Sequence, residues 1–339
     1  MPKVSVIIPV WNVEKYLQKC LKSVVTQTLD DIEIIIINDG SPDGSQKIID
    51  DFSRDYSNIK AFKIINGGLG NARNYGLKNA TGKYVTFIDS DDFVEPNYLK
   101  LLYEKAEKHD SDIVCFSSYY LYFGNLKIKS PYLYLPKTEK SKKKYIVLTL
   151  AFACNRLYKR EMFENINFAE NRLLFEDIPV TVTLLAKAKK INYIRKSLYN
   201  YRVRSTSILG IERKKISLKS LDIFQILLEL RENFIKENLY DKYYEELEGI
   251  TILYVHRRFI FTSLPSDKRE KIINLYLNFL DINYPKWNKN RYYLNGFDRQ
   301  IIVKSSILFK TIKYSSRKKR PYTNNKDLMK ALKKVIKNR

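Results

Sequence analysis

Three carboxylates are crowded into one short segment of the chain, Asp89-Ser90-Asp91-Asp92. Such groups repel one another unless a cation or hydrogen-bond donors neutralise them. Mg²⁺ and Mn²⁺ take oxygen ligands and commonly bridge one or two carboxylates to the phosphates of a substrate. The alternative is an N-cap, in which Ser90 or Asp92 caps a helix that begins near Pro96. The segment by itself leaves both interpretations open.

Two other segments carry polar residues that suit a nucleotide. Asp39 lies in NDGSPDGS, where a carboxylate can accept hydrogen bonds from a nucleobase or ribose, although Asn-Asp-Gly is also common turn chemistry. Arg73 lies in NGGLGNARN, where the glycines permit close backbone approach and the following helix start favours anions. The alternative for Arg73 is a position along the surface of a helix.

Glu176-Asp177 is a second acidic pair, within LLFEDIPV. A positioned carboxylate can act as a general base, and removing a proton from a reacting group accelerates a reaction ~10²–10⁴-fold. The alternative is a helix N-terminus that carries acidic residues. The chain has 2 histidines, His109 and His256, and neither lies in a recognisable motif. We therefore do not expect a histidine-based metal site or triad.

Strands and helices alternate through the first third of the chain and must position these residues. The strands are expected at 4–10, 32–37, 59–65, 84–88 and 112–122, and the helices at 14–27, 45–56, 70–78 and 95–108. This alternation predicts an α/β fold with a mostly parallel sheet and helices on both faces. Ligands bind beyond the carboxyl ends of such strands, where Asp39, Asn66 and Asp89 follow successive strands.

The remainder of the chain is expected to be largely helical. A charged loop is predicted at 137–144, a strand at 191–204, and helices at 151–162, 177–189, 216–236, 240–261, 268–280, 301–312 and 325–336. We place a boundary near residue 210. Residues 1–210 are the predicted catalytic domain, and residues 211–339 are a predicted basic, mainly helical region.

Basic charge is concentrated in the later part of the chain. Residues 1–110 carry 14 Lys and Arg and 16 Asp and Glu, whereas residues 111–339 carry 47 and 21. Basic amphipathic helices in 211–339 suit an anionic membrane surface. The alternatives are helices that pack on the catalytic domain with a solvated lysine face, or a module that forms homo-oligomers.

Composition also bears on the compartment of the protein. The 3 cysteines are far apart and form no CxxC pair, which fits a reducing environment. The apolar run at the N-terminus is too short for a signal peptide, and no stretch has the length of a membrane span. We expect a cytoplasmic protein, either free or bound peripherally to the inner face of the cell membrane.

Taken together, four segments resemble the family 2 glycosyltransferases with the GT-A fold. They are VSVIIPVWNVEKYLQKCLKSVVTQT, EIIIINDGSPDGS, NGGLGNARNYGLKNATGKYVTFIDSDD and LLFEDIPV, in this order and spacing. The resemblance covers roughly residues 1–205. It implies an inverting enzyme that moves a sugar from a nucleotide-sugar, usually a UDP-sugar, to an acceptor hydroxyl. By analogy, the acceptor is a glycan or lipid-linked oligosaccharide of bacterial surface polysaccharide synthesis.

The resemblance also implies roles for individual residues. Asp177 is the general base, and Asp91 ligates Mn²⁺ or Mg²⁺ beside the diphosphate, with Asp89 contacting the ribose or a metal-bound water. The segment YRVRSTS at 201–207 resembles a basic loop that folds over the pyrophosphate. The other residues implied in donor binding are Pro9, Asp39, Asn66, Arg73, Ser90, Glu176, Arg202, Arg204 and Ser207.

Two other functions compete with this interpretation. A nucleotidyltransferase that makes nucleotide-sugars would carry a glycine-rich basic loop after the first strand, where this chain has PVWNVEKYL. A nucleic-acid-binding protein would use the net charge of +24, but the acidic segment disfavours it and no recognition motif is present. We therefore expect no nucleic-acid partner.

Overall fold

A computed structural model describes residues 1–130, 138–149, 151–205, 207, 218–260, 266–294 and 322–337 of the protein. The chain divides into two compact units. The first comprises residues 1–135 and 149–204, and the second comprises residues 136–148 and 205–339.

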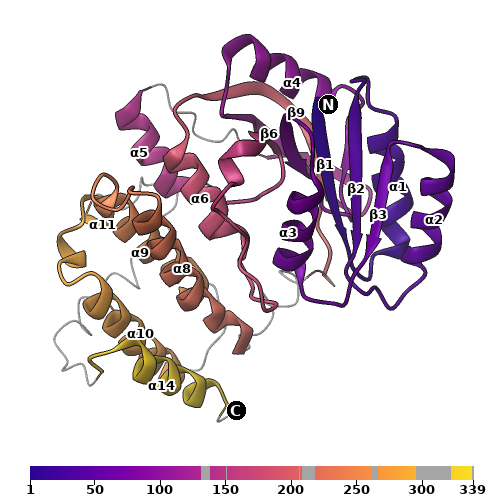
Figure 1. Ribbon diagram of the computed structural model, residues 1–339. Coiled ribbons are helices and arrows are strands. Elements are labelled where there is room, and N and C mark those ends of the chain that lie inside the picture. The colour runs from indigo at the N-terminus through magenta and orange to yellow at the C-terminus, as the bar shows by residue number, and fades with distance from the viewer. Residues whose placement is uncertain are drawn as a thin grey trace. The chain divides into compact units, whose positions relative to one another are not determined.

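Nine strands among the described residues form one sheet in the first unit, in the order β3-β2-β1-β4-β8-β6-β9-β5, with β7 paired to β6. Figure 1 shows β1, β2 and β3 of this sheet side by side. The strands are β1 (Val4–Val10), β2 (Ile32–Asn38), β3 (Ile59–Lys63), β4 (Tyr84–Phe87), β5 (Phe93–Val94), β6 (Ile113–Phe123), β7 (Leu126–Lys129), β8 (Arg156–Lys159) and β9 (Ile191–Arg202).

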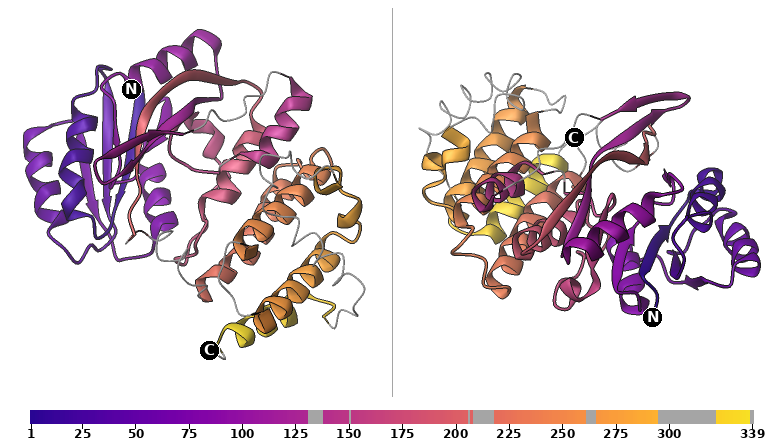
Figure 2. Two further views of the ribbon diagram at one scale, coloured as in Figure 1. Left: turned by 180° about the vertical axis from the view of Figure 1, so that it is seen from behind. Right: turned by 90° about the horizontal axis from the view of Figure 1, so that it is seen from above.

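The sheet is parallel across β3, β2, β1 and β4, and mixed beyond β4. β8 runs antiparallel to both of its neighbours, β4 and β6, whereas the long strands β6 and β9 run parallel and side by side (Figure 2). Both β1 and β2 are buried along their whole length, as expected for parallel strands covered on two faces. The predicted α/β fold is confirmed.

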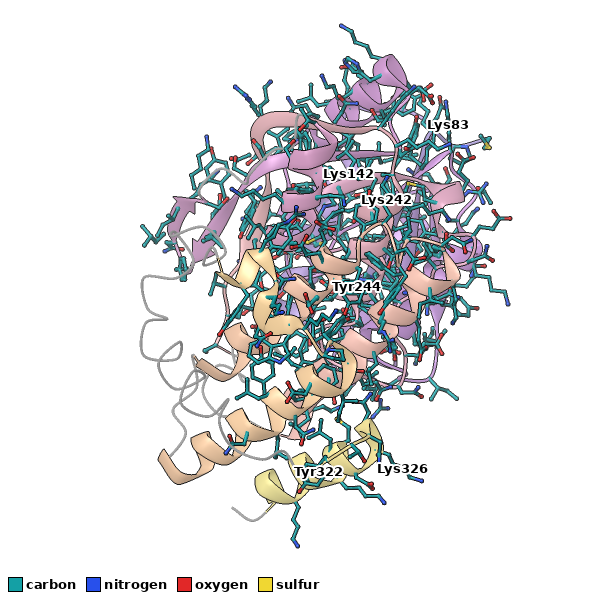
Figure 3. The ribbon with its side chains drawn as sticks, turned by 90° about the vertical axis from the view of Figure 1, so that its left-hand side faces the viewer. Lys83, Lys142, Lys242, Tyr244, Tyr322 and Lys326 are labelled. Carbon is teal, nitrogen blue, oxygen red and sulfur yellow. The ribbon has the colours of Figure 1, made fainter. Side chains whose placement is uncertain are left out.

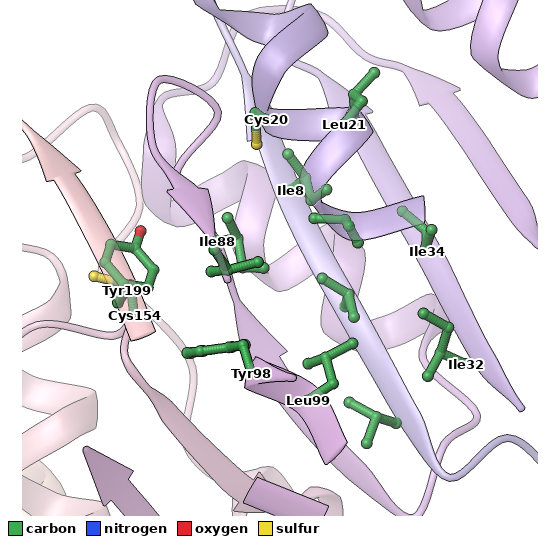
Figure 4. Packing of buried hydrophobic residues seen from close by; sticks show 14 of the residues in the cluster. Ile8, Cys20, Leu21, Ile32, Ile34, Ile88, Tyr98, Leu99, Cys154 and Tyr199 are labelled. Carbon is green, nitrogen blue, oxygen red and sulfur yellow. The ribbon is translucent and has the colours of Figure 1, made fainter. Parts of the chain in front are cut away.

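Helices cover both faces of the sheet. They are α1 (Glu14–Val25), α2 (Ser45–Asp55), α3 (Leu69–Asn79) and α4 (Tyr98–His109). Leu21 of α1 and Leu99 of α4 belong to the same buried cluster as Ile8 and Ile34 of the sheet (Figure 4). α3 lies on the opposite face, where Gly76 abuts Ile7 so closely that a Cβ would lie 2.4 Å from Ile7 Cγ2.

Two predictions made from the sequence are wrong. Residues 151–162 contain β8 and a 3₁₀ helix (Arg160–Phe163) instead of an α-helix, because a short apolar run has no period that separates a buried strand from a helix. The predicted loop at 137–144 contains the start of α5 (Glu139–Leu148). Thr138 Oγ1 accepts a hydrogen bond from the Ser141 backbone N–H, which is N-cap chemistry.

The second unit is helical in its described part. It contains α5, α8 (Asp222–Lys236), α9 (Tyr244–Ile260), α10 (Ser266–Asn283), α11 (Arg291–Leu294), α14 (Asn325–Lys337) and two 3₁₀ helices (Leu218–Leu221 and Trp287–Lys289). The predicted helix 301–312 lies outside the described residues. No helix among those described is long and apolar enough to cross a membrane.

Polar and aromatic contacts join the helices of the second unit. The ammonium groups of Lys142 and Lys242, labelled in Figure 3, lie 5.7 Å and 5.0 Å from the centre of the Tyr243 ring. The side-chain amide of Asn278 in α10 bonds both the C=O and the N–H of Tyr322, just before α14.

Candidate active site at the carboxyl edge of the sheet

The Asp89–Asp92 segment forms the turn between β4 and β5. Asp89 accepts a hydrogen bond from Arg73 Nη2 at 2.9 Å, and the Asp91 carboxylate accepts two from the guanidinium of Arg204. Burial raises the pKa of Asp91, and the neighbouring Asp89 adds to this, while Arg204 opposes it. Ser90 is buried between them. The turn therefore presents two partly open carboxylates, each paired with an arginine.

Asp92 has a different environment from Asp89 and Asp91. It is almost wholly buried, with Oδ2 bonded by the Tyr199 hydroxyl at 2.8 Å and Oδ1 by the Arg202 backbone N–H at 2.7 Å. Burial raises the pKa of Asp92 well above its ordinary value. Asn97 occupies the N-cap position of α4, so neither Ser90 nor Asp92 caps that helix. Asp92 instead ties the acidic turn to β9.

Arg73 connects the two acidic motifs. Its Nη1 donates to Glu176 Oε1 at 2.6 Å and its Nη2 donates to Asp89 Oδ1. The side chain is 3% exposed and its guanidinium lies 5.3 Å from the centre of the Phe168 ring. Burial by itself would lower the pKa of Arg73, but Asp89 and Glu176 outweigh it and raise that pKa. The alternative position along a helix surface is therefore wrong.

Asp39 follows β2 and fixes the glycine-rich turn. Its two carboxylate oxygens accept hydrogen bonds from the backbone N–H groups of Gly67 and Gly68, at 2.7 Å and 2.9 Å. Burial raises the pKa of Asp39, although these bonds oppose the shift. Asn66 Nδ2 donates to the Asp39 C=O at 2.9 Å, and Pro9 lies buried near the end of β1.

The glycines of this turn make room for another part of the same chain. Gly68 has φ +93°, and a Cβ there would lie 2.8 Å from the Arg172 Cα. A Cβ on Gly70 would lie 1.9 Å from the Ala169 C=O oxygen. Arg172 Nη2 also donates to the Asn66 C=O at 2.6 Å. The close backbone approach predicted from the glycines is therefore made by residues 169–172, which lead to Glu176-Asp177.

Glu176 and Asp177 lie at the start of α6 (Asp177–Lys187). Glu176 is buried against Arg73, whereas Asp177 is half-buried beside it. Burial, with the adjacent Glu176, raises the pKa of Asp177 to about 8. A carboxylate with such a pKa is a stronger base than an ordinary aspartate and is still ionised in part at neutral pH.

Arg202 and Arg204 share one aromatic contact. Their guanidinium carbons lie 4.8 Å and 4.7 Å from the centre of the Tyr16 ring, in α1. Arg202 Nε also donates to the Asp91 C=O at 2.9 Å. Ser207 belongs to the second unit, so its place in the site remains a prediction from the sequence. Thr206 lies outside the described residues.

Several residues that contact the predicted ones were missed from the sequence, namely Tyr16, Phe168, Arg172 and Tyr199. No signal in the sequence marks Tyr16 or Tyr199, because the chain contains 26 tyrosines and 17 phenylalanines. From the sequence, proximity can be inferred only for residues that are close in the chain or share a periodic pattern. These four residues contact the motifs through tertiary packing.

The donors present fit a hard cation that a substrate helps to hold. No group of three or more His, Cys, Asp or Glu side chains gathers closely enough to hold a metal ion in the part of the chain that is described. Asp89 and Asp91 nevertheless offer carboxylate oxygens on one turn, and Mg²⁺ is commonly held by one or two carboxylates together with substrate phosphates.

The arrangement of strands and helices is an α/β fold that a solved structure shares. The crystal structure of S. aureus TarS 1-349 in complex with UDP-GlcNAc has a TM-score of 0.68 to this chain, at 20% sequence identity. The match covers 99% of this chain and 91% of TarS 1-349. At this identity the similarity is one of fold.

Sequence comparisons give the family. The model for glycosyl transferase family 2 matches residues 5–166. A cholesterol galactosyltransferase of Borreliella burgdorferi is 36% identical over 263 residues, which are 71% of this chain and 72% of that protein. The chain belongs to glycosyltransferase family 2. This membership favours a glycosyltransferase over a nucleotidyltransferase or a nucleic-acid-binding protein.

A second relative is a longer protein. Glycosyltransferase GlyA of Streptococcus pneumoniae serotype 4 is 38% identical over 232 residues, which are 63% of this chain. The matched part makes up 32% of GlyA, so the chain spans about a third of that relative.

Proposed function

We propose that the protein is an inverting glycosyltransferase that moves a sugar from a UDP-sugar to a hydroxyl of a glycan or lipid-linked acceptor. The observation that supports this most directly is the Arg73 bridge, which joins Asp89 of the acidic turn to Glu176, beside Asp177. One guanidinium thus links the acidic turn to the residue that precedes the candidate base. UDP is the proposed carrier because the TarS structure of the same fold contains UDP-GlcNAc.

In this mechanism Asp177 removes the proton from the acceptor hydroxyl. The acceptor oxygen attacks the anomeric carbon, the bond from that carbon to the diphosphate breaks, and the electron pair leaves with the diphosphate. A single displacement inverts the configuration, so one base suffices and no covalent nucleophile is required. The raised pKa of Asp177 suits this role, because a base is most effective with a pKa near the working pH.

The donor would be held by the groups at the strand ends. Asp39, Asn66 and Pro9 are the proposed uridine contacts, with the remaining lone pairs of the Asp39 carboxylate directed to the base. Arg202 and Arg204 are the proposed partners of the diphosphate, because arginine forms strong bidentate hydrogen bonds with phosphate. Asp91 and Asp89 would hold Mn²⁺ or Mg²⁺, which supplies positive charge beside the departing diphosphate.

We also propose a place for this reaction. The protein would act in the cytoplasm, free or peripherally on the inner face of the cell membrane, in the synthesis of a bacterial surface polysaccharide. The basic helical region 211–339 would contact the acceptor, an anionic membrane surface or a second copy of the chain. The relatives described above are bacterial, which supports this setting.

A screen of donors tests the proposal. Thermal stabilisation and sugar-nucleotide hydrolysis are measured with UDP-, GDP- and dTDP-sugars, each with and without Mn²⁺. We expect a UDP-sugar with Mn²⁺ to give the largest response, and Asp91→Ala to abolish metal-dependent hydrolysis. Asp31→Ala is the control, because Asp31 is an exposed aspartate of the same unit that pairs with Lys3. A response to none of the nucleotide-sugars contradicts the proposal.

A further inference from the structure

The candidate metal carboxylate is held by an arginine of the same chain. Arg204 donates from Nε to Asp91 Oδ2 at 2.8 Å, and its Nη2 donates to the same oxygen. The side chains of Asp91 and Arg204 are 18% and 16% exposed, so water screens this ion pair only in part. Arg204 therefore supplies the positive charge that a bound cation would otherwise supply to Asp91.

Arg202, the last residue of β9, and Arg204, just beyond the strand, are attached in different ways. The backbone N–H of Arg202 bonds Asp92 Oδ1 and its Nε bonds the Asp91 C=O, so Arg202 is tied to the turn by backbone groups as well as by its side chain. Arg204 is held at the turn through the Asp91 carboxylate and stacks on Tyr16. The Tyr16 ring can still support the Arg204 guanidinium after the carboxylate is released.

Charge balance connects Arg204 with both ligands of the site. Asp89 is already paired with the buried Arg73, so a cation that binds the Asp91 carboxylate competes with Arg204 for its negative charge. A partly buried guanidinium that loses its anion is destabilised unless another anion replaces it. A diphosphate is such an anion, and it also supplies oxygens to the cation.

We propose that Arg204 forms an ion pair with Asp91 in the free protein. When a divalent cation binds Asp91 in place of Arg204, the Arg204 side chain moves to the donor diphosphate. Divalent cation and nucleotide then bind cooperatively, and neither binds well alone. The inference rests on the proposed function, since it requires a diphosphate-bearing ligand at this turn. It adds that Arg204 suppresses metal binding in the free protein, which is a separate effect from holding the diphosphate.

The affinity for Mn²⁺ is measured from the electron paramagnetic resonance signal of the free ion, with and without UDP, on the whole chain. For the wild type we expect UDP to tighten Mn²⁺ binding by at least ~10-fold, and Mn²⁺ to tighten UDP binding by the same factor. Arg204→Gln should bind Mn²⁺ alone ~5–20-fold more tightly than the wild type, and the effect of UDP should shrink. Arg195→Gln is the control, since it removes one positive charge from an exposed position of β9.

The outcomes separate the two hypotheses. If the wild type binds neither UDP nor Mn²⁺ with UDP, the proposed function fails. If the wild type binds both, and Arg204→Gln binds Mn²⁺ alone no more tightly than Arg195→Gln does, the exchange is overturned while the function stands. If Arg204→Gln fails to fold, Arg204→Lys is measured instead. This variant keeps the positive charge but loses one of the two hydrogen bonds to Asp91, so it should strengthen binding of Mn²⁺ alone by a smaller factor.

Discussion

Arg73 joins the acidic turn to the segment that carries the candidate base. The Asp89 and Glu176 carboxylates that it bonds come from distant parts of the chain, and each is close enough for a charge-assisted hydrogen bond. Removing one partner from such a buried pair costs about 3–5 kcal/mol, because an uncompensated charge remains. Arg73 thus has a structural role in addition to any contact that it makes with a donor.

Asp177→Asn should abolish transfer while leaving donor binding intact. The amide is nearly the same size as the carboxylate but cannot accept the acceptor proton, so we expect kcat to fall ~10²–10⁴-fold. Measured transfer rates and UDP affinity separate these two effects. The control is Glu164→Gln, an exposed acid of the same unit, and a normal kcat in Asp177→Asn would exclude Asp177 as the base.

The pH dependence should report the environment of Asp177. Its pKa of about 8 means that the basic form accumulates as pH rises, so kcat/KM should increase up to about pH 8 and then level off. The raised pKa also means that ionising Asp177 opposes folding, so its contribution to stability declines as pH rises from about 4 to about 8. A kcat/KM that stays constant between about pH 5 and about pH 9 contradicts the raised pKa of Asp177.

At the scale of elements, the glycine-rich turn before α3 and the loop before α6 depend on each other. The turn accepts the loop because Gly68 and Gly70 have no side chains where Arg172 and Ala169 approach. Asn74 of α3 fastens the same loop, since its side-chain amide accepts from the Phe168 N–H and donates to the Phe168 C=O. The position of Glu176-Asp177 is therefore set by α3 as well as by α6.

Gly68→Ala should be more damaging than Gly124→Ala. Both glycines have positive φ, +93° and +62°, so both substitutions cost about 1–3 kcal/mol of backbone strain. Only Gly68 faces another backbone, since nothing lies within 4 Å of a Cβ at Gly124. We expect a larger drop in melting temperature and a loss of transfer activity for Gly68→Ala alone, and equal behaviour of the two variants would disprove the close-packing argument.

At the other end of the strands, Glu33 holds β2 to its neighbours through a buried carboxylate. Burial by itself would raise its pKa, but hydrogen bonds from Lys60, Ser5 and Thr81 outweigh this and lower it to about 2. The carboxylate also accepts from the Gly82 N–H at 3.0 Å. The ionised form is thus favoured in the folded protein.

Glu33→Gln should lower the stability of the first unit without changing catalysis. A pKa lowered from 4.5 to about 2 corresponds to roughly 3 kcal/mol in favour of the folded state, present above about pH 4.5 and lost as pH falls through about 2. The free energy of unfolding, measured by urea denaturation, should therefore be lower for the variant than for the wild type at about pH 7. This difference should be smaller at about pH 3. A difference in the free energy of unfolding that does not change with pH contradicts the lowered pKa of Glu33.

At the scale of the whole molecule, positive charge is distributed unevenly along the chain. Residues 1–110 are nearly neutral and contribute most of the proposed site, whereas the excess of lysine and arginine lies beyond them. The second unit buries its own aromatic residues, including Phe224 and Phe279, whose ring centres are 4.9 Å apart. The net positive charge of this region favours anionic partners.

The whole protein should bind vesicles that contain anionic lipid, and salt should weaken this binding. Cosedimentation with phosphatidylglycerol vesicles at about 0.1 M and about 1 M salt measures it, because the Debye length falls from about 10 Å to about 3 Å between them. Neutral phosphatidylcholine vesicles are the control. Equal binding to both lipids, or binding that salt leaves unchanged, rules out an electrostatic attachment to the membrane.

The sequence by itself determined the α/β fold, the family and the strand ends where Asp39, Asn66 and Asp89 lie. The fold and the strand ends follow from local periodicity, and from the rule that carboxyl ends of parallel strands meet at one edge. The family follows from the resemblance of four segments to family 2 glycosyltransferases. The apolar run of β2 and the turn residues that follow it are adjacent in the chain, so local sequence was sufficient to predict them.

Only the tertiary structure decided which charges pair with which. The Arg73 bridge, the contact of Arg204 with Asp91 and the contacts of Arg202 and Arg204 with the Tyr16 ring join residues far apart in the chain. Neither propensity nor spacing carries that information, because such contacts follow from how the sheet and helices pack. The same reason explains why β8 resembled a helix in the sequence, since its pairing with β4 and β6 is visible only after folding.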